Sequence, residues 1–135
     1  MVSDSNTLRA EFSQSGPANI DEFGTVKDRA GFLGLRQMDS CHAVRDGVRY
    51  PAVLLTTGMT DPRVEPWQVS KMAARLQAAV TTLPRVDRNP VLLRVEFDAG
   101  HGLGSTRQQA DALRADEFAF AFWRSGMAGF QPKAP

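Results

Sequence analysis

Two short motifs carry residues whose chemistry fits a shared catalytic role. Asp61 and Arg63 lie in TTGMTDPRV, and His101 lies between Gly100 and Gly102 in AGHGLGS. A histidine can carry protons near neutral pH, provided that an acceptor on its second ring nitrogen fixes the tautomer. A carboxylate such as Asp61 can supply that acceptor. Asp61 and His101 are therefore candidate site residues, although an aspartate before a proline is also typical of a turn and a histidine between glycines is also typical of a loop. Arg63, taken from the sequence alone, is a surface cation.

Each motif follows an apolar run that predicts a buried strand. The first run covers residues 52–56, after Pro51, and the second covers residues 91–97. Continuous apolar runs are typical of strands covered on both faces, as in parallel sheets. Between them, residues 66–80 have apolar positions at helical spacing, with Pro66 in the first turn, where its missing N–H costs nothing. A right-handed strand–helix–strand crossover is therefore expected.

Further helices are predicted on both sides of this unit. Apolar residues at helical spacing predict one helix over about residues 27–38 and a final helix over about residues 106–124. Ser105 and Gln108 have the spacing of a capping box at the start of the final helix. Gly126 suits the position just beyond its C-terminal end.

These elements predict the α/β fold class, with residues 50–126 as a strand–helix–strand–helix unit behind an N-terminal helical segment. Residues 1–20 are polar and are expected to be loose. Two parallel strands bury too little surface to stand alone, so the pattern predicts part of a larger sheet. The strand at 52–56 would then expose an edge. Exposed edges promote pairing, so the isolated chain is expected to be marginally stable or oligomeric.

Composition excludes several classes of partner and cofactor. The 16 basic and 15 acidic residues leave a net charge of +1, which predicts neither nucleic-acid nor membrane binding. No apolar run approaches the roughly twenty residues that cross a bilayer, and the N-terminus has no apolar signal core. The single cysteine, Cys41, favours a reducing compartment, and we expect a cytoplasmic protein. Two histidines and one cysteine give no metal-ligand spacing, so no metal or cofactor is predicted.

Both motifs resemble those of a known family. The segments TTGMTDPRVEPWQVSKMAARLQ and VLLRVEFDAGHGLGSTR resemble the C-terminal part of the catalytic domain of the prolyl oligopeptidase family of serine peptidases. EFGTVKDRAGFLGLRQM resembles the stretch between nucleophile and acid in that family. The similarity covers roughly residues 8–126, which is nearly the whole chain. It implies a partial α/β-hydrolase fold that holds the last two parallel strands and their helices.

The resemblance also implies roles for individual residues. Asp61 matches the acid and His101 the base of a Ser-Asp-His triad. Arg63 matches an arginine that binds a substrate carbonyl, and Val64 lies where the family lines its specificity pocket. Asn19 and Phe23 stand where prolyl-specific members show Trp and Tyr. That departure argues against strict proline specificity.

The triad serine is the missing component. Family members carry it in a G-x-S-x-G turn upstream of the acid, and none of the serines of this chain stands in such a turn. The resemblance therefore implies peptide-bond hydrolysis by a truncated or split fragment that is inactive alone. Its expected partners are a peptide substrate and either an N-terminal serine-bearing fragment or a second copy bound through the exposed strand edge. The alternative is a non-catalytic remnant or peptide-binding module.

Overall fold

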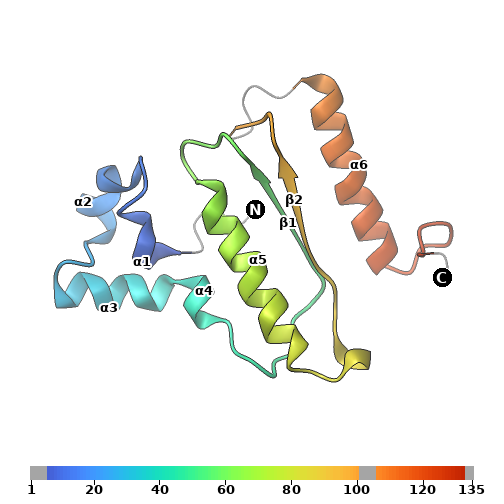
Figure 1. Ribbon diagram of the computed structural model, residues 1–135, viewed down its shortest axis with the longest axis horizontal. Coiled ribbons are helices and arrows are strands. Elements are labelled where there is room, and N and C mark those ends of the chain that lie inside the picture. The colour runs from blue at the N-terminus through green and yellow to red at the C-terminus, as the bar shows by residue number, and fades with distance from the viewer. Residues whose placement is uncertain (1–5, 101–105, 133–135) are drawn as a thin grey trace.

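The computed structural model describes residues 6–100 and 106–132, and within them the fold is α/β (Figure 1). At its centre a strand, a helix, a second strand and a second helix follow one another along the chain. These are β1 (Val53–Gly58), α5 (Pro66–Thr81), β2 (Val91–Glu96) and α6 (Arg107–Arg124). Short helices precede or connect them: α1 (Thr7–Ala10), η1 (Gly16–Asn19), α2 (Ile20–Phe23), α3 (Arg29–Met38), α4 (Ser40–Ala43) and η2 (Arg85–Asp87). The predicted order of elements is therefore confirmed.

The two strands form a parallel pair in continuous register. Val53 lies opposite Val91, and Gly58 lies opposite Glu96. The pairing extends past the apolar run that predicted β1, since the N–H of Met59 still donates to the carbonyl of Glu96. Within the described residues the sheet contains these two strands alone.

The hydrophobic core lies between the sheet and α5. Pro66 occupies the first turn of α5, as predicted, and the helix then presents an apolar stripe to the strands. Side chains of alternate strand residues point to this stripe, because successive residues of a strand face opposite sides of the sheet. The buried residues of the cluster are Val44, Leu55, Val69, Ala73, Leu76, Ala79, Val80 and Val91.

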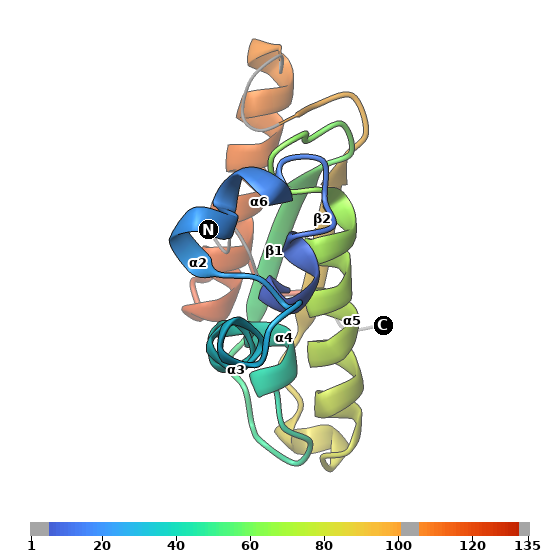
Figure 2. The same ribbon diagram turned by 90° about the vertical axis from the view of Figure 1, so that its left-hand side faces the viewer.

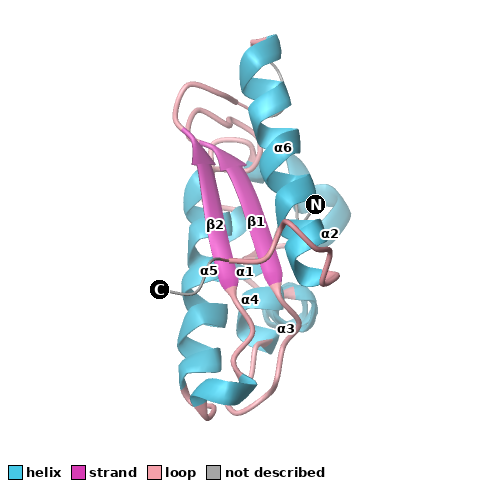
Figure 3. Cartoon of the chain, turned by 90° about the vertical axis from the view of Figure 1, so that its right-hand side faces the viewer, coloured by secondary structure: helices cyan, strands magenta, loops and turns pink. Residues whose placement is uncertain are grey.

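Helix α6 lies on the opposite face of the sheet from α5 (Figures 2 and 3). Its capping box joins Thr106 and Gln109, one residue later than the predicted pair of Ser105 and Gln108. Ser105 itself lies outside the described residues. Gly126 follows the helix with a φ of 79°, a conformation that suits glycine at the end of a helix. No residue of α6 is buried.

The N-terminal segment is packed against the domain in the part that the structure describes, whereas the sequence predicted residues 1–20 to be loose. Asn6 is buried, and its side-chain amide donates to the carbonyl of Gln68 in α5 at 2.8 Å. The hydroxyl of Thr7 donates to the carbonyl of Leu35 in α3 at 2.5 Å. These are contacts of polar side chains, so a search for apolar periodicity does not detect them.

Asp39 joins three parts of this N-terminal region. The residue is 1% exposed, and its carboxylate accepts the backbone N–H groups of Leu8 at 3.1 Å and His42 at 2.9 Å. The imidazole Nδ1 of His42 lies 3.0 Å from the same carboxylate. Asp39 thereby caps α4, a helix that the sequence does not predict, and holds α1 beside it.

Within residues 6–100 and 106–132, no helix has both the length and the apolar character that a membrane crossing requires.

We predict that Asp39→Ala lowers the free energy of unfolding by about 2 kcal/mol, because it leaves two partly buried N–H groups without their acceptor. Asp46→Ala is the control: Asp46 pairs with Arg75 at 2.6 Å, but its side chain is 62% exposed. An exposed pair of this kind contributes less than about 1 kcal/mol. Urea denaturation of both variants measures the difference, and equal losses would contradict the role given to Asp39.

Candidate functional site

A tight turn after β1 fixes the candidate acid. The carboxylate Oδ1 of Asp61 accepts the backbone N–H groups of Arg63 at 2.8 Å and Val64 at 3.0 Å. A short polar side chain that bonds the backbone two and three residues ahead sets the course of the chain locally. Asp61, Arg63 and Val64 therefore belong to one turn. The Arg63 side chain is exposed, while Val64 packs against the hydrophobic core.

This turn lies against the loop that follows β2. The N–H of Thr60 donates to the carbonyl of Ala99 at 3.2 Å, and Ala99 is buried. At Gly58 the two backbones come closest: a Cβ placed there would lie 2.3 Å from the carbonyl oxygen of Ala99 and 2.5 Å from that of Gly100. A glycine at residue 58 thus lets the acid-bearing turn meet the segment that leads directly to His101. His101 itself lies outside the described residues.

The N-terminal segment supports the acid-bearing turn from the other side. The hydroxyl of Ser15 donates to the carbonyl of Pro62 at 2.8 Å, and the N–H of Gln14 donates to the carboxylate of Glu65 at 3.3 Å. The sequence did not single out Gln14 and Ser15, which belong to the segment of residues 1–20 that was expected to be loose. Nothing in their spacing could have revealed the contact, since some fifty positions separate each of them from its partner.

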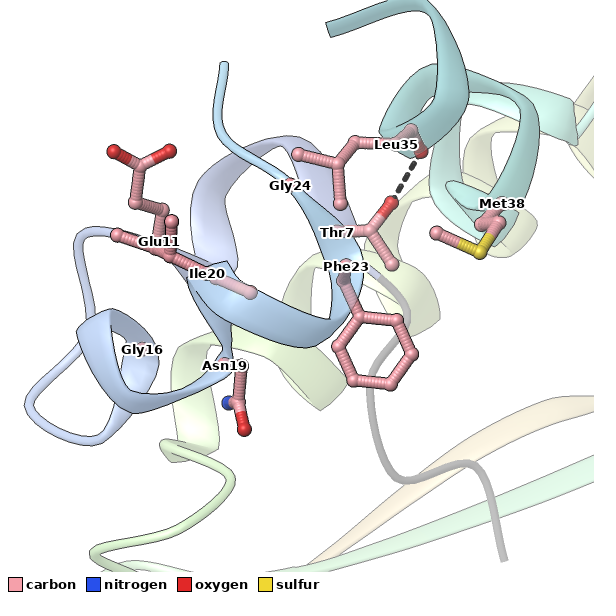
Figure 4. Close-up of a pocket in the computed structure, with 10 residues that line it drawn as sticks. Thr7, Glu11, Gly16, Asn19, Ile20, Phe23, Gly24, Leu35 and Met38 are labelled. Atoms are coloured by element: carbon pink, nitrogen blue, oxygen red, sulfur yellow. Dashed lines mark hydrogen bonds between the residues drawn. The ribbon is translucent and has the colours of Figure 1, made fainter. Parts of the chain in front are cut away.

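A pocket of about 280 Å³ lies among the N-terminal helices, next to this contact (Figure 4). Its walls come from α1, η1, α2 and α3. The lining residues are Thr7, Ala10, Glu11, Gly16, Asn19, Ile20, Phe23, Gly24, Leu35 and Met38. Most of these side chains are apolar, and Asn19 contributes an amide. Such a lining is suited to an apolar side chain with one polar contact.

Glu11 anchors the wall of this pocket. Its side chain is only 5% exposed and points away from Phe23 and Met38 (Figure 4). One carboxylate oxygen accepts the N–H of Val26 and the hydroxyl of Thr25, each at 2.8 Å. The bond from Val26, followed by those from Thr25 and Lys27, holds the pKa of the Glu11 carboxyl below its ordinary value. The carboxylate thus ties α1 to the loop before α3.

The surroundings of Cys41 and His42, which follow Asp39 in the chain, disfavour a nucleophilic thiol. Burial, and then the negative charge of Asp39, raise the pKa of the Cys41 thiol. A raised pKa disfavours the thiolate, which is the reactive form. The imidazole of His42 faces Asp39 through Nδ1. Across the described part of the chain, no three His, Cys, Asp or Glu side chains gather as metal ligands would.

The parallel pair, with helices on both faces and an acid-bearing turn at its carboxyl end, is part of an α/β-hydrolase fold. The model of the prolyl oligopeptidase family matches residues 6–127. The chain belongs to the prolyl oligopeptidase family.

Relatives and solved structures agree with this assignment. The chain is 34% identical over 121 residues to a prolyl endopeptidase from Elizabethkingia meningoseptica, covering 89% of this chain and 16% of the relative. It is 37% identical to dipeptidyl aminopeptidase BI from Pseudoxanthomonas mexicana, covering 80% of this chain and 14% of that protein. Prolyl oligopeptidase B from Galerina marginata, solved with a 35mer substrate, superposes with a TM-score of 0.80 at 27% identity, covering 91% of this chain and 17% of the other. The chain therefore spans about one sixth of the length of these proteins.

We predict that Gly58→Ala lowers the free energy of unfolding by about 1–3 kcal/mol, because the new methyl group forces backbone atoms apart. The matched control is Gly34→Ala in α3, where a Cβ would meet nothing within 4 Å. Replacing that exposed helical glycine should stabilise the chain by about 0.5–1 kcal/mol. Urea denaturation measures both changes, and amide NMR shifts at Thr60 report whether the turn moves. Equal effects of the two variants would contradict the close approach at Gly58.

A second prediction concerns acid stability. Because folding lowers the pKa of Glu11, its contribution is complete above the pKa of the unfolded chain and is lost as the pH falls through the folded value. The melting temperature of the wild type should therefore fall across this acidic range, and Glu11→Gln should flatten the decline. Glu22→Gln, at an exposed position of α2, serves as the control. An identical pH profile for wild type and Glu11→Gln would contradict this role.

Proposed function

We propose that this chain supplies the acid and the base of a Ser-Asp-His peptidase site, with Asp61 as the acid and His101 as the base. Asp61 accepts a hydrogen bond from one ring nitrogen of His101. The other nitrogen takes the proton of a serine hydroxyl as the serine oxygen attacks the peptide carbonyl, and then passes it to the leaving amine. Water hydrolyses the resulting acyl-enzyme by the same proton relay.

The contact at Gly58 is the observation that supports this pairing best. It holds the turn of Asp61 against Ala99 and Gly100, the two residues that lead directly to His101. An acid and a base must lie within hydrogen-bond reach to act together. Parallel strands bring their carboxyl ends to the same edge of a sheet, which is where both motifs occur.

Two residues of the acid-bearing turn are proposed to bind the peptide. Arg63 would donate to a carbonyl on the acyl side of the scissile bond, and its exposed side chain leaves the guanidinium available. Val64 would line the pocket for the specificity residue. Asn19 and Phe23, which line the pocket in Figure 4, replace the Trp and Tyr of prolyl-specific members. We therefore propose a preference that is not restricted to proline.

The nucleophile is proposed to come from a separate serine-bearing segment, since no serine of the chain stands in a G-x-S-x-G turn. That segment would pair with the free edge of β1. Val53 and Met59 donate to the β2 side of the sheet, to Pro90 and Glu96. Successive N–H groups of a strand point to opposite sides of it, so those of Leu54 and Thr56 point away from β2. On that side of β1 the described residues contain no further strand. Pairing of this edge with a second copy is the alternative.

For the location of the assembled enzyme in the cell, we propose the cytoplasm.

The same missing serine favours a second candidate function, a peptide-binding module without chemistry. Such a module would keep the exposed Arg63 as its peptide contact and would tolerate the loss of His101. The two candidates therefore differ in what His101→Ala does, and an experiment on that variant separates them.

A fluorophosphonate probe, which reacts with activated serines, tests the proposal. The purified chain alone should not be labelled. Mixed with the portion of the Elizabethkingia prolyl endopeptidase that precedes the matched segment, it should cause labelling of that larger polypeptide. His101→Ala should slow this labelling at least about a thousandfold, because triad members act as a unit.

Arg63→Ala is the paired control, since it should weaken peptide turnover while leaving the labelling of the serine largely intact. Labelling of the chain itself would show that one of its own serines is the nucleophile, contrary to the proposal. Peptide binding that depends on Arg63, together with no labelling in any mixture, would support the binding module instead.

A further inference from the structure

The peptide unit between Pro62 and Arg63 is held at both of its polar groups. Its N–H, which belongs to Arg63, donates to Oδ1 of Asp61 at 2.8 Å. Its carbonyl, which belongs to Pro62, accepts the hydroxyl of Ser15 at 2.8 Å. The N–H and the carbonyl of one peptide unit lie in a common rigid plane. The bond from Ser15 therefore acts on the same group that holds the carboxylate of the candidate acid.

Rotation of this peptide plane is the movement that the Ser15 bond opposes. The ring of Pro62 fixes its φ, so its ψ is the remaining backbone freedom of this residue. A change in ψ would turn the carbonyl away from Ser15 and, at the same time, the N–H away from Asp61. A half-turn of the plane would also take the φ of Arg63 to a positive value, as in a type II turn. Among the described residues only glycines have a positive φ, so the plane has the orientation that serves both bonds.

A bond to the carbonyl also strengthens the bond made by the N–H. Hydrogen bonds in a chain polarise one another, with a gain of about 10–30% for each bond. The Ser15 hydroxyl, the peptide unit and the Asp61 carboxylate form such a chain, in which the hydroxyl is the first donor and the carboxylate the last acceptor. The N–H of Val64 adds a second bond to the same carboxylate oxygen at 3.0 Å. The effect of Ser15 thus reaches the carboxylate through the backbone.

The loop that carries Ser15 is fixed firmly enough to support the turn. Gly16 is buried, and a Cβ placed there would lie 1.8 Å from the carbonyl oxygen of Ala10, so the loop backbone packs directly on the end of α1. The N–H of Gly16 donates to the carbonyl of Ser13 at 3.1 Å, and the hydroxyl of Ser13 donates to the carbonyl of Ala10 at 2.7 Å. Helix α1 is itself bonded to α3 and α5 by the polar side chains described above.

The Ser15 bond differs from an ordinary loop contact in its reach and in its exposure. A loop serine can satisfy its hydroxyl on backbone close to it in the sequence, as Ser13 does. Ser15 instead bonds a carbonyl 47 positions further along the chain. Because this bond is exposed, water can replace it, so its loss should cost little global stability. Its main effect is therefore local, on the turn that it contacts.

We propose that Ser15 is a positioning residue of the candidate site, which orients the carboxylate of Asp61 through the peptide unit between Pro62 and Arg63. The inference rests on the proposed function for the role of Asp61 as the acid. A carboxylate that orients a histidine needs further hydrogen bonds to hold its own geometry. In this chain those bonds begin in the N-terminal loop and end on the carboxylate.

Amide hydrogen exchange followed by NMR tests the proposal on the chain alone. Ser15→Ala should raise the exchange rates of the Arg63 and Val64 N–H groups by about two- to tenfold, the factor expected for one net hydrogen bond. The amide proton of Arg63 should also move upfield, because its bond to Asp61 becomes weaker. Ser15→Thr keeps the hydroxyl and should restore both readings. Unchanged readings in Ser15→Ala would overturn the proposal.

Ser13→Ala is the matched control, because it removes the same kind of bond from the same loop without touching the turn. Ser13 is 8% exposed, so this variant should lower the urea midpoint more than Ser15→Ala does. It should nevertheless leave the exchange of Arg63 and Val64 at the wild-type rates. Equal loosening of the turn in both variants would show a general loss of structure and would refute the positioning role.

The fluorophosphonate mixture described above separates the inference from the function on which it rests. There, Ser15→Ala should slow serine labelling and Ser15→Thr should restore it. Labelling at the wild-type rate by Ser15→Ala would overturn the inference and leave the catalytic proposal intact. If Ser15→Ala loosens the turn but the wild-type mixture is not labelled, Ser15 still positions Asp61 and the catalytic proposal fails.

Discussion

The contact at Gly58 constrains the rest of this structure. The backbone of β1 ends against the carbonyl oxygens of Ala99 and Gly100, and no side chain fits between them. This approach is possible because β1 and β2 are parallel and in register, so that both strands end on the same side of the sheet. The apolar packing of α5 fixes that register, since a shift by one residue would turn Leu55 away from the core. Core packing and the geometry of the candidate site are therefore coupled through one glycine.

The central part of the fold could be predicted because its signals are local. The apolar runs of β1 and β2 and the stripe of α5 each lie within a single stretch of sequence. The start of α6 was placed one residue early in its capping box, because Ser105 and Thr106 both have a glutamine three positions later. Only the observed bonds between Thr106 and Gln109 distinguish the two possibilities.

The N-terminal region could not be predicted for the opposite reason. Its attachment depends on single polar groups whose partners are distant in sequence, such as Asn6 with Gln68 and Ser15 with Pro62. Asp39 follows the helix predicted over residues 27–38 and nothing in the sequence marked it, yet it is among the most buried side chains of the described structure. Periodicity reports burial of apolar surface and carries no information on such contacts. The support that the N-terminal segment gives to the acid-bearing turn is visible only in three dimensions.

The acid-bearing turn and helix α6 differ in how the described residues hold them. The turn is held by bonds from Arg63, Val64 and Ser15 and by the approach at Gly58, all of which lie within this chain. These contacts fix the turn in one conformation, and a group that is already fixed binds at a lower conformational cost. Helix α6 has the opposite character: none of its residues is buried, and Asp116 and Arg124 bind it to Arg94 and Asn89. The position of the candidate acid is therefore set by the fold of the described residues, whereas α6 is held beside the sheet mainly through polar side chains at the surface.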